Sequence, residues 1–151
     1  MTKKGKNVMS AKKGSNKATF GPASPVQKVF WDDDDTDLII FGGGAGGGKS
    51  AMARMKILKY VNCPKFEALF VRATNPQLEQ SGGLWPTSVE LYRQFGARFT
   101  SKPKKFKFPS GATVSMMPCQ DDKALANFDG GEYSLILIDE AQNHTFEQFN
   151  Y

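Results

Sequence analysis

Two uninterrupted apolar runs stand out along this chain of 151 residues, at positions 38–41 and 135–138. Runs of this kind predict strands that are buried on both faces of a sheet. Residues 67–72 predict a third strand. Residues 51–60 are rich in helix formers and predict a helix between the strands 38–41 and 67–72. Strands that alternate with helices predict an α/β fold with a mostly parallel sheet and helices on both faces.

Weaker patterns predict the remaining elements. Ser24 followed by Pro25 predicts the start of a helix, with Ser24 as the N-cap and Pro25 in the first turn. Polar and apolar residues alternate on both sides of a Pro-Ser-Gly turn, at 105–108 and 113–116, which predicts a β-hairpin. Short helices are expected at residues 77–81, 84–95 and 121–128.

The net charge of +5 resides in the first residues of the chain. Six lysines precede the first apolar cluster with no acid among them, and without them 14 basic residues stand against 15 acidic ones, a net charge of −1. We therefore expect residues 1–19 to be a basic, disordered arm and residues 20–151 to be folded. The arm is either a non-specific nucleic-acid contact or a solubilising tail.

Composition excludes several classes of protein. No apolar run approaches the length of a membrane span and no signal peptide is visible, so we expect a soluble, cytoplasmic protein without a membrane partner. Cys63 and Cys119 lie far apart and outside any metal-ligand spacing, which predicts two reduced thiols packed as small apolar residues.

The most specific chemical motif is a glycine-rich loop that ends in Lys-Ser. It fits the pattern G-x-x-x-x-G-K-[ST], in which backbone N–H groups and a helix N-terminus surround phosphate groups. A flexible linker would have the same glycine content, but here a predicted strand precedes the loop and a predicted helix follows it. The candidate ATP-binding residues are Gly43, Gly44, Ala45, Gly46, Gly47, Gly48, Lys49 and Ser50.

Within this loop the last two residues have separate roles. Lys49 can reach the β- and γ-phosphates of ATP, and Ser50 can bind Mg²⁺ through its hydroxyl. A second acidic motif follows the apolar run 135–138, where Asp139 and Glu140 come at the carboxyl end of a predicted strand. We expect Asp139 to support Mg²⁺ and Glu140 to activate the attacking water, although an acidic pair at this position can also be an exposed turn or cap.

Two further side chains are candidates for the same site. Gln27 lies shortly before the phosphate loop, and its amide can both donate to and accept from an adenine edge; the alternative is an exposed helical residue. Arg72 ends the predicted strand 67–72, and its guanidinium suits the γ-phosphate as charge develops there; the alternative is a structural salt bridge.

Together these segments resemble the large terminase subunit of tailed bacteriophages, from about Ser24 to the end of the chain. The phosphate loop and the acidic strand are shared with many ATPases, whereas the Arg-x-Thr-x-Pro-Gln-Leu and Gly-x-Leu-Trp segments are more specific to this family. The resemblance rests on residues 42–50, 71–78, 81–85, 127–134 and 139–142.

The resemblance implies a DNA-packaging motor that hydrolyses ATP with Mg²⁺ and drives double-stranded DNA into a procapsid. It implies an ATPase fold of the additional-strand, helicase-like type, and a homo-oligomeric ring with a portal protein and a small terminase subunit as partners. It places the protein in the host cytoplasm and transiently at the portal. The family's phosphate-loop lysine and serine match Lys49 and Ser50, and its acids match Asp139 and Glu140. An upstream glutamine and a strand-end arginine match Gln27 and Arg72.

The chain departs from the family pattern where it stops, at Tyr151. The family's γ-phosphate-sensing strand and its C-terminal nuclease domain should follow, so we expect an incomplete sheet, weak stability and little nuclease activity. Two other functions remain open: a truncated fragment that binds nucleotide or DNA without hydrolysis, and a helicase-like DNA translocase. The lysines between positions 102 and 107 either track a phosphate backbone or form a solvated strand face with Phe106 and Phe108 in the core.

Overall fold

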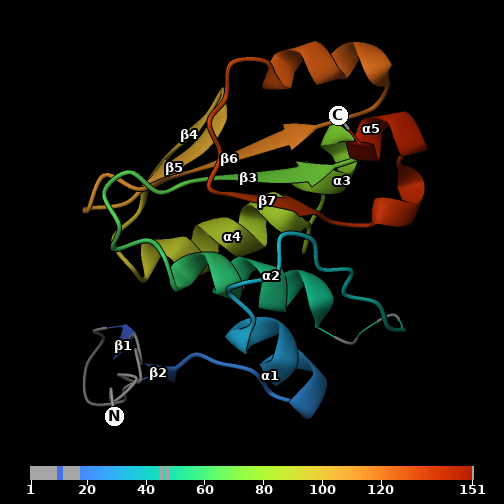
Figure 1. The fold of residues 1–151 in the computed structure, drawn as a ribbon. Helices are drawn as coiled ribbons and strands as arrows, with labels where there is room; N and C mark the ends of the chain where they lie inside the picture. The colour runs from blue at the N-terminus through green and yellow to red at the C-terminus, as the bar shows by residue number, and fades with distance from the viewer. Residues whose placement is uncertain (1–9, 12–17, 45, 47, 151) are drawn as a thin grey trace. The chain divides into compact units, whose positions relative to one another are not determined.

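The computed structural model describes residues 10–11, 18–44, 46 and 48–150 of the chain. These residues belong to two compact units, Met1–Lys59 and Tyr60–Tyr151. The first unit contains the glycine-rich loop, and the second contains the five-stranded β-sheet (Figure 1).

The first unit is built around two helices, α1 (Pro25–Asp32) and α2 (Lys49–Leu58). As predicted, Ser24 is the N-cap of α1, and its hydroxyl accepts a hydrogen bond from the Gln27 amide at 3.2 Å. Within the expected basic arm, the described residues form a short antiparallel pair, β1 (Ser10–Ala11) and β2 (Ala18–Thr19).

A buried lysine connects α2 to the acidic turn after α1. The Lys56 ammonium donates to the Phe30 carbonyl at 2.8 Å and to the Asp33 carbonyl, and lies 3.4 Å from an Asp34 carboxylate oxygen. Burial lowers the pKa of Lys56, and the nearby Asp34 carboxylate partly opposes that shift. The turn after α1 therefore provides oxygen acceptors for Lys56 of α2.

The buried strand predicted at residues 38–41 is wrong. No strand is assigned there, and the Leu38 and Ile40 side chains are 60% and 83% exposed. Phe41 stacks on Phe30 at 4.7 Å between ring centroids. An apolar run becomes a strand only where a neighbouring strand completes its hydrogen bonds, and among the described residues none pairs with this segment.

The second unit contains a five-stranded sheet in the order β4-β5-β6-β3-β7. Its central strand, β3 (Glu67–Arg72), runs parallel to β6 (Thr113–Pro118) and to β7 (Leu135–Ile138). β5 (Lys104–Lys107) pairs antiparallel with β6 and with β4 (Arg98–Ser101). The sheet is thus mixed, with two parallel and two antiparallel pairings, where a mostly parallel one was predicted.

The predicted hairpin is confirmed as β5–β6, whereas β4 was not predicted. The β4 sequence Arg-Phe-Thr-Ser has a single apolar residue, Phe99, so it shows no alternating pattern. This strand forms because it pairs with the edge of β5. In that pairing, Phe99 lies opposite Phe106.

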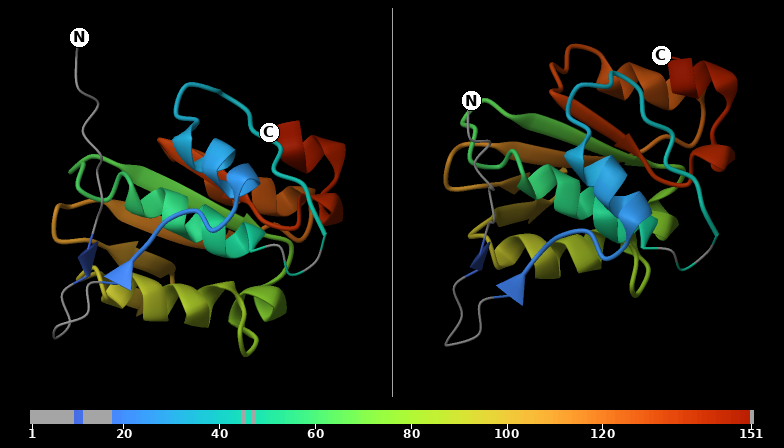
Figure 2. Two further views of the ribbon diagram at one scale, coloured as in Figure 1. Left: turned by 90° about the horizontal axis from the view of Figure 1, so that it is seen from below. Right: turned by 60° about the horizontal axis from the view of Figure 1, so that its bottom comes forward.

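Helices cover both faces of this sheet, as predicted (Figures 1 and 2). On one face, α4 (Leu84–Arg93) presents Tyr92 to Phe106, with ring centroids 4.9 Å apart, and α3 (Asn75–Glu79) precedes it. On the other face, the 3₁₀ helix η1 (Asp122–Phe128) packs Leu125 against Leu69 and Val71. The chain continues from β7 through η2 (Ala141–Asn143) to α5 (Phe146–Asn150).

Candidate nucleotide-binding site

The glycine-rich loop of the first unit leads directly into α2. Lys49 is the first residue of this helix and Gly48 is its N-cap, with φ +71°. Gly43 and Gly46 also have positive φ values, of 142° and 79°. Side-chain-bearing residues rarely adopt such φ values, so the conformation itself requires glycine at these three positions.

The Lys49 ammonium contacts the glycine-rich loop that precedes it. Its Nζ atom donates to the carbonyl oxygens of Gly43 at 2.8 Å and Gly44 at 2.9 Å. The lysine thus contacts the start of the loop, while its backbone lies in the first turn of α2, at the positive end of the helix dipole. A phosphate oxygen offers the ammonium a stronger, charge-assisted partner than these neutral carbonyls.

Gln27 lies beside the loop. Its Nε2 atom is 2.9 Å from where a Cβ on Gly48 would stand, and its Oε1 atom accepts from the Ala23 amide at 2.8 Å. The structure therefore brings the predicted adenine-binding residue next to the predicted phosphate loop. A side chain at position 48 would displace the Gln27 amide from this place.

The remaining predicted loop residues divide between described and undescribed positions. Ser50 occupies the first turn of α2 and is half-buried. Ala45 and Gly47 lie outside the described residues, so their part in the loop stays a prediction. Gly43, Gly44, Gly46, Gly48, Lys49, Ser50 and Gln27 are all in the first unit.

In the second unit, an arginine and two acids meet at one edge of the sheet. Val71 pairs with Ile138 in the parallel register of β3 and β7, so Arg72 and Asp139 emerge side by side. Arg72 Nε lies 3.3 Å from Asp139 Oδ2, and Arg72 Nη2 lies 3.7 Å from Glu140 Oε1. These side chains are 14%, 9% and 40% exposed for Arg72, Asp139 and Glu140.

Arg72 is held from its other side by the chain that follows β3. Its Nη1 atom donates to the Gln77 carbonyl at 2.9 Å. Thr74 caps α3 by accepting from the Gln77 amide at 3.3 Å, which fixes that carbonyl at the start of the helix. The guanidinium thus spans from α3 to the acidic pair, so the salt-bridge interpretation describes its contacts in this structure.

Glu140 has an unusual backbone conformation. Its φ of 57° and ψ of 48° are left-handed, and among the described residues no other non-glycine has a positive φ. Its carboxylate accepts a hydrogen bond from the Gln142 side-chain amide. Conformations of this kind cost on the order of 1–3 kcal/mol and cluster at functional sites. Sequence reasoning did not identify Gln142 or Gln77 as contacts, since both roles depend on the tight turns after β7 and β3.

Among the residues that the structure describes, no three His, Cys, Asp or Glu side chains are grouped so that they could hold a metal ion. No helix in the described ranges is both long and apolar enough to cross a membrane. Nucleotide-bound Mg²⁺ takes one or two protein oxygens together with phosphate oxygens, and a serine hydroxyl and an aspartate carboxylate are oxygens of that kind. The two predicted ligands, Ser50 and Asp139, belong to different units, so their part in one metal site stays a prediction.

The two thiols differ from each other. Cys119 is buried as predicted, and burial, followed by the Asp121 and Asp122 charges, raises the pKa of its thiol. Cys63 is exposed, which corrects the expectation that both cysteines pack as small apolar residues. The sequence after Cys63, Pro-Lys, continues a surface turn in which the Cys63 amide donates to the Tyr60 carbonyl.

Comparison with known proteins gives one family match. Residues 40–151 match the family model described as "Terminase large subunit, T4likevirus-type, N-terminal". Neither the curated proteins nor the solved structures contain a match to the chain. The matched segment includes the glycine-rich loop, the mixed sheet and the acidic pair. The chain therefore belongs to the family of N-terminal parts of T4-like large terminase subunits.

Proposed function

We propose that this chain is the ATP-hydrolysing module of a viral DNA-packaging motor. Family membership supports the motor role, and the observation that carries the hydrolytic role is the Arg72–Asp139–Glu140 cluster at the carboxyl edge of a parallel strand pair. Open α/β sheets bind their ligands at this edge. The proposal extends to the glycine-rich loop as the site that holds the triphosphate.

Binding of ATP depends on residues of the first unit. We propose that the loop amides and Lys49 hold the β- and γ-phosphates, and that the Gln27 amide contacts the adenine edge. The contacts of Lys49 with two loop carbonyls and the position of Gln27 beside Gly48 support this assignment. Ser50 and Asp139 are the residues that would hold Mg²⁺, which would neutralise charge that develops on the phosphates.

Hydrolysis requires a base for the attacking water and a cation for the developing phosphate charge. Glu140 is the proposed base, because its carboxylate is partly exposed while Asp139 beside it is buried. Arg72 is the proposed cation. Since it contacts both acids in this structure, part of its interaction with them has to be exchanged for phosphate contacts during turnover.

The proposed motor function requires other protein chains as partners. We propose that hydrolysis drives double-stranded DNA into a procapsid, with further copies of the chain in a ring, a portal protein and a small terminase subunit as partners. The family match supports the packaging role in this proposal, and the named partners rest on the resemblance to the large terminase subunit.

The direct test is phosphate release by the full chain from ATP, measured with Mg²⁺ and again with excess EDTA. The proposal expects Mg²⁺-dependent release above the level of a Lys49→Ala sample prepared in parallel. If ATP binds with no release, the chain is a non-hydrolysing nucleotide binder. If ATP does not bind at all, the assignment of the glycine-rich loop is wrong.

A further inference from the structure

The outer strands of the sheet present three cations on one face. Arg98 on β4 pairs directly with Lys107 on β5, and Lys105 lies two residues earlier on the same strand. Residues two apart on a strand share a face, and so do paired residues of neighbouring strands. Arg98, Lys105 and Lys107 therefore form one group, called the basic face below.

The opposite face of the same strands fixes this orientation. Phe106, between the two lysines, is fully buried and packs against Trp85 and Tyr92 of α4, with ring centroids 4.7 and 4.9 Å away. A strand that buries Phe106 has to turn Lys105 and Lys107 outward. The aromatics of the hairpin are thus core residues and are not available to stack on bases.

The cations of the basic face are not neutralised by acids within the described part of the chain. No ion pair there involves Arg98, Lys105 or Lys107. Lys104 differs, because it points to the other face and pairs with Glu79 at 2.6 Å. By register, Glu67 lies on the same face as Lys107 but two strands away, about 10 Å at the usual strand spacing.

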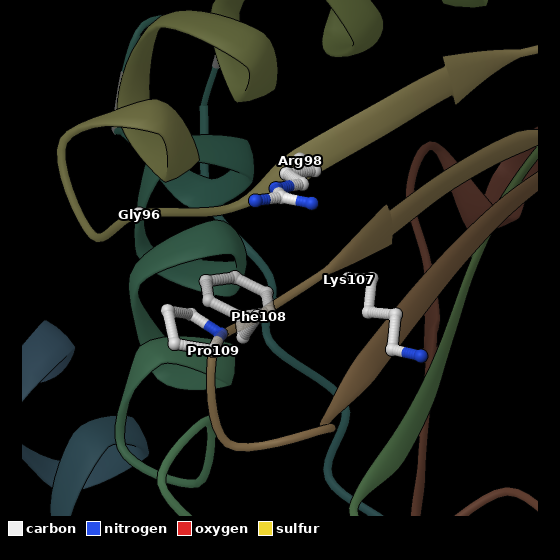
Figure 3. A pocket seen from close by; sticks show the side chains of 5 residues that line it. All are labelled: Gly96, Arg98, Lys107, Phe108 and Pro109. Atoms are coloured by element: carbon white, nitrogen blue, oxygen red, sulfur yellow. The ribbon is translucent and has the colours of Figure 1, made fainter.

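A surface pocket extends the basic face at its end. It has a volume of about 400 Å³ and is lined by Gly96, Arg98, Lys107, Phe108 and Pro109. In Figure 3, Arg98 and Lys107 project from two neighbouring strands beside this pocket. A polyanion that lies across the strands would therefore meet two cations and this pocket at one end of the basic face.

We propose that the basic face binds the phosphate backbone of duplex DNA without reading its sequence. Lys105 and Lys107 are separated by about 6.8 Å along the strand, and a duplex carries one phosphate charge per about 1.7 Å of its axis, so both lysines can contact phosphates at once. Arg98, beside Lys107, reaches a neighbouring phosphate. Non-specific single-strand binding adds exposed aromatics for stacking, and the positions of the basic face offer none.

This inference deepens the proposed function, since it names the surface through which the motor would hold its DNA. It does not depend on ATP, so the two can fail separately. The test is fluorescence anisotropy with two labelled 30-base-pair duplexes of unrelated sequence, without nucleotide, over a series of NaCl concentrations. The full chain is compared with Lys105→Ala/Lys107→Ala and with a control of equal charge loss, Lys65→Ala/Lys123→Ala, whose lysines are exposed elsewhere in the same unit.

For Lys105→Ala/Lys107→Ala we expect the slope of log K, the DNA-binding constant, against log [NaCl] to be shallower by about 1.8 than for the unsubstituted chain. The change should be the same on both duplexes. The control keeps the slope of the unsubstituted chain. Equal slopes for the two double variants overturn the inference and leave the basic arm as the source of any DNA binding. Tighter binding to oligo-dT than to duplex with no change in slope also overturns it.

Two readouts separate this result from misfolding and from failure of the proposed function. Thermal midpoints within the range of the control variant establish that the double variant is folded. Binding of a fluorescent ATP analogue, unchanged in Lys105→Ala/Lys107→Ala, separates DNA contact from nucleotide contact. If ATP is not hydrolysed by any sample while the slope still differs, the DNA surface stands and the hydrolytic role fails.

Discussion

Arg72 and Asp139 face each other across the parallel strands β3 and β7, with Arg72 Nε 3.3 Å from Asp139 Oδ2. Both side chains are largely buried, and the same guanidinium reaches Glu140 and the Gln77 carbonyl. One cation therefore compensates two acids at the sheet edge and ties them to α3. The pair has a structural effect that can be measured apart from catalysis.

Replacement of Arg72 by alanine is expected to destabilise the fold. It leaves Asp139 buried without its ion pair, and breaking a buried pair from one side costs about 3–5 kcal/mol. Urea unfolding followed by circular dichroism measures the change. Arg93→Ala is the control, since that arginine is exposed and lies over the Phe99 ring. A loss below about 1 kcal/mol for Arg72→Ala would show that the pair contributes little.

Replacement of Lys49 by alanine is expected to weaken ATP binding by at least about tenfold, or about 1.4 kcal/mol. The variant removes the ammonium that now contacts the Gly43 and Gly44 carbonyls and leaves the loop backbone in place. Isothermal titration calorimetry with ATP measures it. The control, Lys28→Ala, removes a lysine of the same unit that pairs with Asp32 on the surface. Equal affinities in both variants would refute the loop assignment.

Gly48→Ala is expected to distort the loop for two separate reasons. Its φ of +71° disfavours alanine by about 1–2 kcal/mol, and its Cβ would stand 2.9 Å from Gln27 Nε2. ATP affinity should fall, because the alanine both strains the loop and displaces the Gln27 amide that is proposed to contact adenine. Gly21→Ala, with open space around its Cβ, is the control. Full affinity in Gly48→Ala would contradict the described loop conformation.

The two cysteines should react at different rates with iodoacetamide at pH 8. Cys63 is exposed, whereas burial and the Asp121 and Asp122 charges raise the pKa of Cys119 and leave less thiolate there. Peptide mass spectrometry should find Cys63 modified first, and both modified alike in urea. Faster modification of Cys119 in the folded chain would contradict its placement under η1.

Much of the sheet could be predicted because its signals are local. Strands β3 and β7 and the β5–β6 hairpin follow from apolar runs and alternation, and the Ser24 cap follows from one dipeptide. The run at 38–41 failed because apolarity indicates a preference for burial, while a strand also needs a hydrogen-bonded neighbour. β4 was missed for the opposite reason. Its sequence has no alternating pattern, and it is a strand because it pairs with β5.

The sequence could suggest which residues belong to the candidate site, but not which of them contact each other. Motif spacing identified Lys49, Asp139 and Glu140, whereas no local signal states that Arg72 spans from Gln77 to both acids. That contact depends on the parallel register of β3 and β7, which is a long-range property. The left-handed Glu140 likewise depends on the turn after β7 and not on its own preference.

The central claim is that Glu140 activates the water that attacks ATP, and phosphate release by Glu140→Gln tests it most directly. The amide keeps the shape of the side chain but cannot accept the proton, so hydrolysis should fall by about 100-fold or more while calorimetry finds ATP binding retained. Glu147→Gln, an exposed glutamate of α5, should release phosphate like the unsubstituted chain. Phosphate release by Glu140→Gln at the unsubstituted rate would contradict the account.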